Sequence, residues 1–413
     1  PSHPHMVLFS FKVHILRWDD ISSLIRQVVP PLYPLVTRSD PFAISKFGEH
    51  DHKGSMGRIA IVGGSKDYTG APYYAGLSAL KFGADLCTVH CSTTASIPIK
   101  SYSPELMVSP FYEDNPLGFI AGSTGPLKTS SLDLFTKQHS VVVGPGLGQY
   151  PEIQDTVRLL ISNARRANKT LVIDADGLFA IGSDPSIIAG YQRCILTPNR
   201  MEFRRLVDAT VAWLSQDPNQ DSSLPGEVAK ASCSLQGQLL QELRSDCEYN
   251  QLRALATALG GVCVLLKGER DLLCAGDDVL VVTEQGSPRR CGGLGDILAG
   301  SLGVTLYWAV EKRRPNLRYL TRHLSLLAAS DALPGNASGY LSKDMQSPLD
   351  NFHPNPNLPS ALAPTDSDAV LQAALLASVT ARRAAQKAFQ QFGRAVTAPD
   401  VIPLLGPALR EIE

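Results

Sequence analysis

The stretch that decides the fold is Arg58-Ile-Ala-Ile-Val62, a continuous apolar run that Gly63 and Gly64 bring to an end. A run of this kind is typical of a parallel strand that is buried on both faces of a sheet. The next segment, residues 69–82, has the pattern of a helix, with Pro72 in the first turn, where a missing N–H costs nothing. Together they predict the first strand–helix unit of a larger fold.

The same alternation continues along the chain. Apolar runs recur at residues 86–91, 141–143, 171–173, 194–196 and 262–266, and helical stretches such as residues 152–167 lie between most of them. Strands that alternate with helices predict βαβ units. We therefore expect an α/β fold in which helices cover both faces of a central, mostly parallel sheet.

Three segments depart from this alternation. Residues 1–44 have four prolines between Pro30 and Pro41 and predict an N-terminal extension that includes one short helix. Residues 211–235 are rich in Ser, Gln, Asp and Pro and predict a surface insertion, and residues 333–367 have a proline-rich, polar composition typical of disorder. The expected organisation is an extension over residues 1–44 and one domain over residues 45–413 that carries both insertions.

Composition excludes several classes of protein. The 413 residues include 38 Lys+Arg and 39 Asp+Glu, so the chain lacks the basic excess of proteins that neutralise nucleic-acid phosphates. No run approaches the ~18 apolar residues of a membrane span. The eight cysteines form no Cys-x-x-Cys pair, which argues against a zinc ribbon and a redox dithiol. We expect a cytoplasmic protein that binds neither nucleic acid nor membrane; a mitochondrial form and a homo-oligomer stay open.

The strongest chemical signal is the stretch from Gly286 to Gly300, which reads Gly-Ser-Pro-Arg-Arg-Cys-Gly-Gly-Leu-Gly-Asp-Ile-Leu-Ala-Gly. Gly292, Gly293 and Gly295 allow positive φ angles and a close approach of the backbone to a ligand. A helix begins here, and its free N–H groups and dipole favour an anion. Asp296, at the edge of this anion site, is placed to act as a general base toward a hydroxyl that attacks a phosphate. The alternative is that Asp296 is only an N-terminal helix residue favoured by the dipole.

Three further polar stretches follow predicted strands, where ligands bind in α/β sheets. Lys267, in the first, could approach a nucleotide phosphate or belong to a solvated turn. In the second, Asn199 could begin a helix, and Glu202 could face a metal or close a capping box. In the third stretch, Asp174 could orient a ligand, or it could only act as a capping residue at the end of its strand. The chain contains neither a Walker A lysine motif nor HExxH, so phosphate binding is expected to depend on the glycine stretch.

These motifs occur in one order, and in that order they resemble the ATP-dependent (S)-NAD(P)H-hydrate dehydratases, relatives of the ribokinase-like carbohydrate kinases. The resemblance depends on Gly63-Gly-Ser65, Asp67-Tyr-Thr-Gly-Ala-Pro72, Gly144-Pro-Gly-Leu-Gly148, Asp174-Ala-Asp-Gly177, Thr197-Pro-Asn199, Glu202-Phe203, Lys267-Gly268 and Gly292-Gly-Leu-Gly-Asp296. It covers about residues 46–332 and resumes at 369–413. It implies a ribokinase-like three-layer α/β/α fold with a central, mostly parallel sheet.

The resemblance also implies an activity. Such an enzyme, a hydro-lyase, uses ATP and Mg²⁺ to dehydrate the S epimer of hydrated NADH or NADPH (NADHX or NADPHX), and it yields ADP and phosphate. Phosphorylation turns the C6 hydroxyl, a poor leaving group, into a good one. This cofactor repair implies a partner enzyme, an NAD(P)H-hydrate epimerase.

Site residues are carried over by motif, with Asp296 as the catalytic residue that deprotonates the hydrate hydroxyl. The implied ATP-binding residues are Lys267, Gly268, Glu269, Arg270, Asp271, Gly286, Ser287, Pro288, Arg289, Arg290, Cys291, Gly292, Gly293, Leu294 and Gly295. The implied residues of the dinucleotide site are Gly146, Asn199, Arg200, Met201, Glu202, Phe203, Arg204, Arg205 and Asp296. The ligands of the metal are not predicted.

Two other functions compete with this one. A ribokinase-like kinase of a small alcohol, such as hydroxymethylpyrimidine or hydroxyethylthiazole, would share Gly292–Asp296 but not the stretches at 63–72 and 197–203. A non-catalytic nucleotide-binding protein would retain the fold for a partner. The reaction product distinguishes the enzymes: a stable phosphorylated alcohol indicates the kinase, whereas released phosphate and restored reduced nicotinamide indicate the dehydratase.

Overall fold

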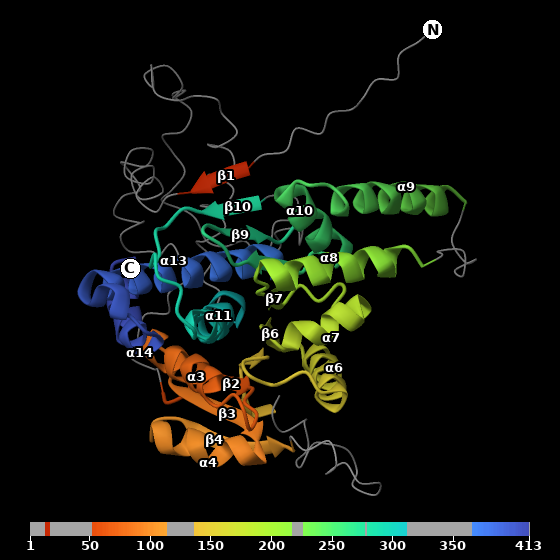
Figure 1. The fold of residues 1–413 in the computed structure, drawn as a ribbon. Coiled ribbons are helices and arrows are strands. Elements are labelled where there is room, and N and C mark those ends of the chain that lie inside the picture. Colours follow the sequence, from red (N-terminus) through yellow and green to blue (C-terminus); the bar gives the residue numbers. More distant parts are fainter. Residues whose placement is uncertain are drawn as a thin grey trace, which may run out of the picture.

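The computed structural model describes residues 13–16, 52–113, 136–216, 226–276, 279–311 and 366–412. In this part of the chain, helices cover both faces of a central sheet, which is the expected three-layer α/β/α arrangement (Figure 1). Most of the predicted 1–44 extension and nearly all of the predicted 333–367 insertion lie outside the described residues.

The sheet has ten strands in the order β1-β10-β9-β8-β7-β6-β5-β2-β3-β4. Their bounds are β1 (Val13–Leu16), β2 (Arg58–Val62), β3 (Leu86–Ser92), β4 (Met107–Tyr112), β5 (Ser140–Val143), β6 (Thr170–Ile173), β7 (Cys194–Leu196), β8 (Cys263–Leu266), β9 (Asp271–Cys274) and β10 (Val279–Val282). Every neighbouring pair in this described sheet is parallel except β8–β9 and β9–β10. The predicted, mostly parallel sheet is therefore confirmed.

Strand β1 was not predicted. It lies within the expected N-terminal extension, where one short helix was expected, and it pairs in parallel with β10 from Val13↔Val279 to Leu16↔Val282. An edge strand of four residues is stabilised by its partner strand, and that partner is distant in the sequence. The local pattern therefore could not show it.

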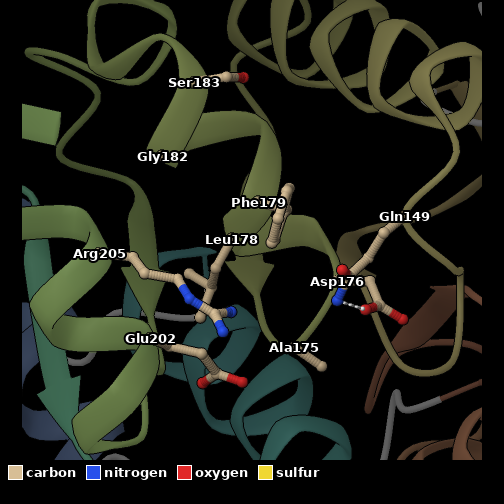
Figure 2. A pocket seen from close by; sticks show the side chains of 9 residues that line it. All are labelled: Gln149, Ala175, Asp176, Leu178, Phe179, Gly182, Ser183, Glu202 and Arg205. Carbon is tan, nitrogen blue, oxygen red and sulfur yellow. Dashed lines mark hydrogen bonds between the residues drawn. The ribbon is translucent and has the colours of Figure 1, made fainter.

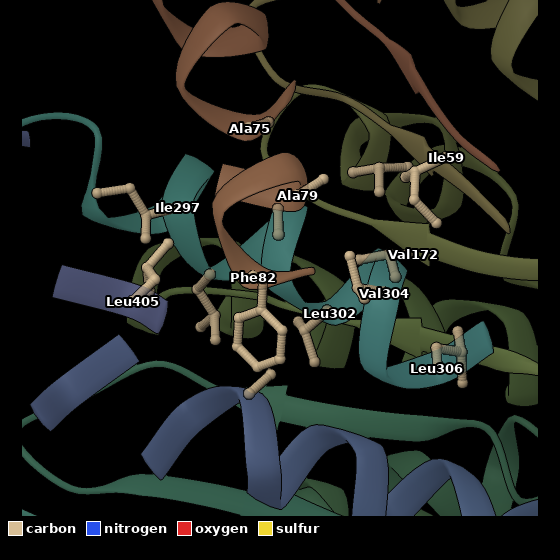
Figure 3. Close-up of a cluster of buried hydrophobic side chains, with 14 of the residues drawn as sticks. Ile59, Ala75, Ala79, Phe82, Val172, Ile297, Leu302, Val304, Leu306 and Leu405 are labelled. Carbon is tan, nitrogen blue, oxygen red and sulfur yellow. The ribbon is translucent and has the colours of Figure 1, made fainter. Parts of the chain in front are cut away.

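The strands are buried on both faces, as the continuous apolar runs predicted. Ile59 and Ile61 of β2 point into one core cluster, and Ala60 and Val62 point into the other. The first face carries α3 (Gly70–Phe82), α4 (Thr93–Tyr102), α11 (Leu294–Glu311), α13 (Asp366–Phe392), α14 (Ala398–Val401) and α15 (Leu405–Arg410) (Figures 1 and 3). The second face carries α6 (Pro151–Arg166), α7 (Gly177–Ser183), α8 (Arg200–Leu214), α9 (Gly226–Leu243) and α10 (Glu248–Ala258).

Both ends of the insertion predicted at residues 211–235 belong to helices, and residues 217–225 lie outside the described residues. Val211, Trp213 and Leu214 complete α8 and pack against the core of the second face, and residues 226–235 belong to α9. None of the helices in the described part of the chain has the length and apolar character that crossing a membrane requires.

Helix α11 occupies the centre of the first face and is buried from Ile297 to Val310. Two glycines allow this close packing. A Cβ atom on Gly300 would lie 2.0 Å from the carbonyl oxygen of Ala75 in α3, and one on Gly303 would lie 2.9 Å from a methyl carbon of Val142 on β5. The backbone of α11 therefore rests directly against α3 and the sheet.

Substitution of Gly300 by Ala tests this packing. In an exposed helix the change would stabilise the protein by ~1 kcal/mol, but here α11 must move away from α3, and overpacking costs ~1–3 kcal/mol. Urea denaturation should show a lower free energy of unfolding. Gly237→Ala in α9, where a Cβ meets nothing within 4 Å, is the matched control and should stabilise. A Gly300→Ala variant as stable as the parent would contradict the close contact.

Candidate active site

The carboxyl ends of β2, β5, β6, β7 and β8 lie at one edge of the sheet because these strands are parallel. From β2 the chain proceeds outward to β3 and β4, and then it returns to the other side of β2 as β5. Such a reversal of strand order opens a crevice in which α/β proteins bind ligands. The candidate site lies here.

Glycines bring the loops at this edge into backbone contact. The N–H of Gly64 donates to the carbonyl oxygen of Pro145 at 2.9 Å, so the loops after β2 and β5 are joined. Gly144 has a φ of +132°, and a Cβ there would lie 1.6 Å from the carbonyl oxygen of Asp174. Gly146 has a φ of +65°, and its Cβ would lie 2.9 Å from the carbonyl oxygen of Tyr68. Gly146, predicted to contact the dinucleotide, therefore lies against the loop that precedes α3.

A buried ion pair connects the ends of β6 and β8. The ammonium nitrogen of Lys267 lies 2.6 Å from Oδ1 of Asp174, whose side chain is 2% exposed, and 4.0 Å from Oε2 of Glu202. The hydroxyl of Thr197 also donates to Asp174, at 2.7 Å. Burial lowers the pKa of Lys267, but Asp174, Glu202 and Asp296 outweigh burial and leave it raised. Lys267 therefore stays protonated. Because its ammonium group is bound to Asp174, Lys267 is not part of a solvated turn.

Asp296 lies in the first turn of α11, next to this pair. A Cβ placed on Gly295 would be 3.6 Å from the Lys267 ammonium nitrogen. Burial raises the pKa of Asp296 to about 7, with a further upward contribution from Asp174 and an opposing one from Lys267. A carboxyl group that titrates near neutral pH can both accept and hold a proton at physiological pH, which is the property of a general base.

The glycine stretch before Asp296 forms the predicted turn into α11. Gly293 has a φ of +95°, and a Cβ there would lie 2.7 Å from Cβ of Ala398 and 2.9 Å from the ring of Tyr74. Gly292 and Gly295 do not have a positive φ, so the expected left-handed conformation is confirmed at Gly293 alone. The first N–H groups of a helix have no partner within the helix and favour an anion, and in α11 these groups lie next to Asp296.

The turn between β8 and β9 contains the other predicted nucleotide-binding residues. Glu269 and Arg270 are exposed, but the side chain of Asp271 is directed into the protein. Asp271 accepts hydrogen bonds from the N–H of Gly268 at 3.0 Å and from the hydroxyl of Ser378 at 2.7 Å. The carboxylate of Asp271 thus joins this turn to α13, and its predicted contact with ATP stays a prediction.

The predicted dinucleotide-binding span 199–205 begins α8. Asn199 Oδ1 accepts from the N–H groups of Met201 and Glu202, and Oε2 of Glu202 accepts from the N–H of Asn199 at 2.7 Å, so the capping box is confirmed. Burial raises the pKa of Glu202, and Lys267 opposes this rise. Glu202 thus caps the helix and also faces the charged pair.

The span does not face a single cavity. Glu202 and Arg205 line a hollow of about 260 Å³ that lies next to α7 (Figure 2). Arg200, Phe203 and Arg204 line a second hollow of about 300 Å³ on the side of α10. The first hollow adjoins the charged pair through Glu202, which makes it the better candidate for the substrate.

The predicted site residues include only two of the nine residues that line this first hollow, and they leave out Gln149, Ala175, Asp176, Leu178, Phe179, Gly182 and Ser183. Phe179 is 40% exposed, and the guanidinium of Arg205 lies 5.7 Å from the centre of its ring. Asp176 accepts from the N–H of Gly148 at 2.9 Å and from the side chain of Gln149 at 3.0 Å. Between Asp174 and Asp176, Ala175 has a φ of +45°, a strained conformation that clusters at functional sites. The signal in the sequence was the motif Asp174-Ala-Asp-Gly177 after β6, from which no residue was assigned to the site.

Metal ligands are not evident from the described side chains. No group of three or more His, Cys, Asp or Glu in that part of the chain is arranged to hold a metal ion.

Comparison with known proteins identifies related chains. The sequence model of the family described as NAD(P)H-hydrate dehydratase matches residues 59–347. A relative from Pongo abelii, named ATP-dependent (S)-NAD(P)H-hydrate dehydratase, is 33% identical over 97% of this chain and 92% of its own length. A relative of the same name from Ciona intestinalis is 42% identical over 63% of this chain and 62% of its own length.

Solved structures share the fold. A ribokinase-like superfamily protein from Enterococcus faecalis V583 superposes with a TM-score of 0.57 at 16% identity, over 99% of each chain. The ADP/ATP-dependent NAD(P)H-hydrate dehydratase from Bacillus subtilis, co-crystallised with ATP and Mg²⁺, gives a TM-score of 0.51 at 17% identity, over 90% of this chain and 96% of its own. The predicted ribokinase-like fold is confirmed.

The raised pKa of Asp296 predicts how its removal changes stability with pH. The folded protein binds the Asp296 proton up to about pH 7, whereas the unfolded chain releases it near pH 3.9. Stability is therefore lost as pH rises through this window. Asp296→Asn removes this loss, so its melting temperature should exceed that of the parent by more at about pH 8 than at about pH 5. A difference between the two proteins that does not change with pH would contradict the raised pKa.

Proposed function

The chain belongs to the NAD(P)H-hydrate dehydratase family, and we propose that it uses ATP to dehydrate the S epimer of hydrated NADH or NADPH. The observation that carries this proposal is the position of Asp296, with a pKa of about 7, in the first turn of α11. A general base beside an anion site is what a hydroxyl needs in order to attack a phosphoryl group.

The first step is a phosphoryl transfer. Asp296 accepts the proton of the C6 hydroxyl as that oxygen attacks the γ-phosphorus of ATP, and ADP leaves. The N–H groups at the start of α11 stabilise the charge on the transferring phosphoryl group. The residues supply positions and a proton acceptor, and no covalent intermediate with the protein is required.

The second step is an elimination. The C6–O bond breaks, phosphate leaves with the bonding electrons, and loss of a proton from C5 restores the C5=C6 double bond. Phosphate is a far better leaving group than hydroxide. A fold shared with kinases can therefore catalyse a dehydration, because the phosphorylated hydrate is an intermediate rather than the product.

Lys267 supports this reaction through its charge. Its ammonium group is bound to Asp174 at 2.6 Å and lies close to the first turn of α11. It lowers the pKa of Asp296 against the upward effects of burial and of Asp174. We propose that Lys267 keeps the base ionised near neutral pH and adds positive charge at the edge of the phosphoryl site.

Magnesium enters as part of the ATP co-substrate. Mg²⁺ is usually held by phosphate oxygens and one or two carboxylates rather than by a protein cage, and the described part of the chain offers no cage. No step described above passes through the ion. An epimerase that acts on the same hydrates, a cytoplasmic location and a homo-oligomeric state stay predictions from the sequence.

The kinase of a small alcohol is the less supported function. The family that matches residues 59–347 and the curated relatives carry the dehydratase name. Incubation with MgATP and NADHX should release phosphate and restore the absorbance of the reduced nicotinamide. Accumulation of a stable phosphorylated alcohol, with no change in that absorbance, would favour the kinase instead.

Substitution of Asp296 by Asn tests the assigned base. The loss of a general base lowers turnover by ~10²–10⁴-fold, while ATP binding should change little because the N–H groups remain. The kcat/KM of the parent should rise as pH increases through about 7, where Asp296 ionises. Asp208→Asn on the exposed side of α8 is the control and should match the parent. Turnover of Asp296→Asn within a few-fold of the parent would show that another group accepts the proton.

A further inference from the structure

The two segments assigned to ATP begin side by side at one edge of the sheet. Leu266, at the end of β8, pairs with Leu272, and Asp271, at the start of β9, pairs with Val282, at the end of β10. The β8–β9 turn (residues 267–271) and the segment that follows β10 (residues 283–295) therefore leave the sheet next to each other. Their relative position determines the geometry of any ligand that contacts both.

One side chain binds both segments. Arg382 of α13 donates from Nε to the carbonyl oxygen of Glu284 at 2.6 Å. Its terminal nitrogens donate to the carbonyl oxygens of Gly268, at 3.5 Å, and of Glu269. Arg382 comes 114 residues after Gly268 in the sequence, so no local motif near either segment indicates this contact.

Asp271 holds the guanidinium in place. Its Oδ1 lies 3.1 Å from a terminal nitrogen of Arg382, and the two side chains are 7% and 15% exposed. The same carboxylate accepts the N–H of Gly268 and the hydroxyl of Ser378. A buried carboxylate and a buried guanidinium are stable only when their hydrogen-bonding groups are satisfied, and here the backbone of the turn and α13 satisfy them.

The contacts suit an arginine and no other side chain. The guanidinium is planar and has five donors in a fixed arrangement, whereas a lysine ammonium is a single point charge. Arg382 contacts backbone oxygens at Gly268, Glu269 and Glu284, so it fixes the path of the main chain. The neighbouring Arg383 instead contacts a side chain, the Glu284 carboxylate, at 2.7 Å.

We propose that Arg382 is a positioning residue for ATP, which it serves by holding the β8–β9 turn and the segment after β10 in one geometry. The inference depends on the proposed function in that ATP is the co-substrate. It makes α13 part of the nucleotide site, although α13 lies beyond residues 59–347, which the family model matches. Arg382 acts through the two segments and has no assigned contact with the reacting atoms.

Direct measurement of MgATP binding by calorimetry tests this inference without the dehydratase assay. Arg382→Met should weaken MgATP binding by about tenfold or more, as expected when several charge-assisted hydrogen bonds are lost. Arg382→Lys keeps the charge beside Asp271 and should fold as the parent does, but it cannot reach both segments, so MgATP binding should weaken by about threefold. Lys387→Met removes a surface ion pair of the same helix with Glu411 and is the control.

Steady-state kinetics distinguish a positioning role from general destabilisation. In the Lys variant the KM for ATP should rise, while the KM for NADHX should stay within about twofold of the parent. MgATP binding within twofold of the parent in both variants would overturn the inference, and so would an equal weakening in Lys387→Met. If Arg382→Met does not fold, MgATP binding by Arg382→Lys alone tests the inference. If the parent protein lacks dehydratase activity while both Arg382 variants bind MgATP more weakly than the parent does, the result supports the role of Arg382 and contradicts the proposed function.

Discussion

The Asp174 carboxylate and the Lys267 ammonium lie 2.6 Å apart at the ends of β6 and β8, and the site depends on this pair. It forms only because β7 lies between the two strands and presents Thr197 to the same carboxylate. Since Asp174 is almost fully buried, the ammonium supplies the partner that a buried carboxylate requires. The strand order of the sheet is thus a requirement of the chemistry and not only of the fold.

The same edge shows how distant parts of the chain complete one site. Gly293 turns into α11 where Tyr74 and Ala398 leave no room for a side chain. Arg382, also from the C-terminal part of the chain, binds the β8–β9 turn and the segment after β10. Loops are usually the least ordered part of an α/β fold, and here helices that are remote in sequence fix their backbones.

The sequence predicted what depends on local pattern. The apolar runs gave the buried strands, and the order of motifs indicated Asp296 and the capping box of Asn199. The sequence could not predict β1, because its partner strand β10 is distant in the chain. Nor could it predict the roles of Asp271 and Arg382, because their contact joins segments that are far apart in the sequence. Residues 199–205 are distributed over two hollows because α8 lies between α7 and α10. The spacing of residues in the sequence does not show this arrangement of helices.

Opposing effects determine the pKa of the Asp296 carboxyl group. Ionisation at the start of a helix and beside an ammonium is favoured, whereas burial and the Asp174 carboxylate oppose it. If the favourable influences dominated, Asp296 would be a weak base that is always ionised; if burial dominated, it would be protonated at physiological pH. Helix α11 packs against α3 through Gly300, and the same helix carries Asp296 in its first turn, one turn before that contact. The contact that fixes α11 against α3 therefore also fixes where Asp296 lies relative to Asp174 and Lys267.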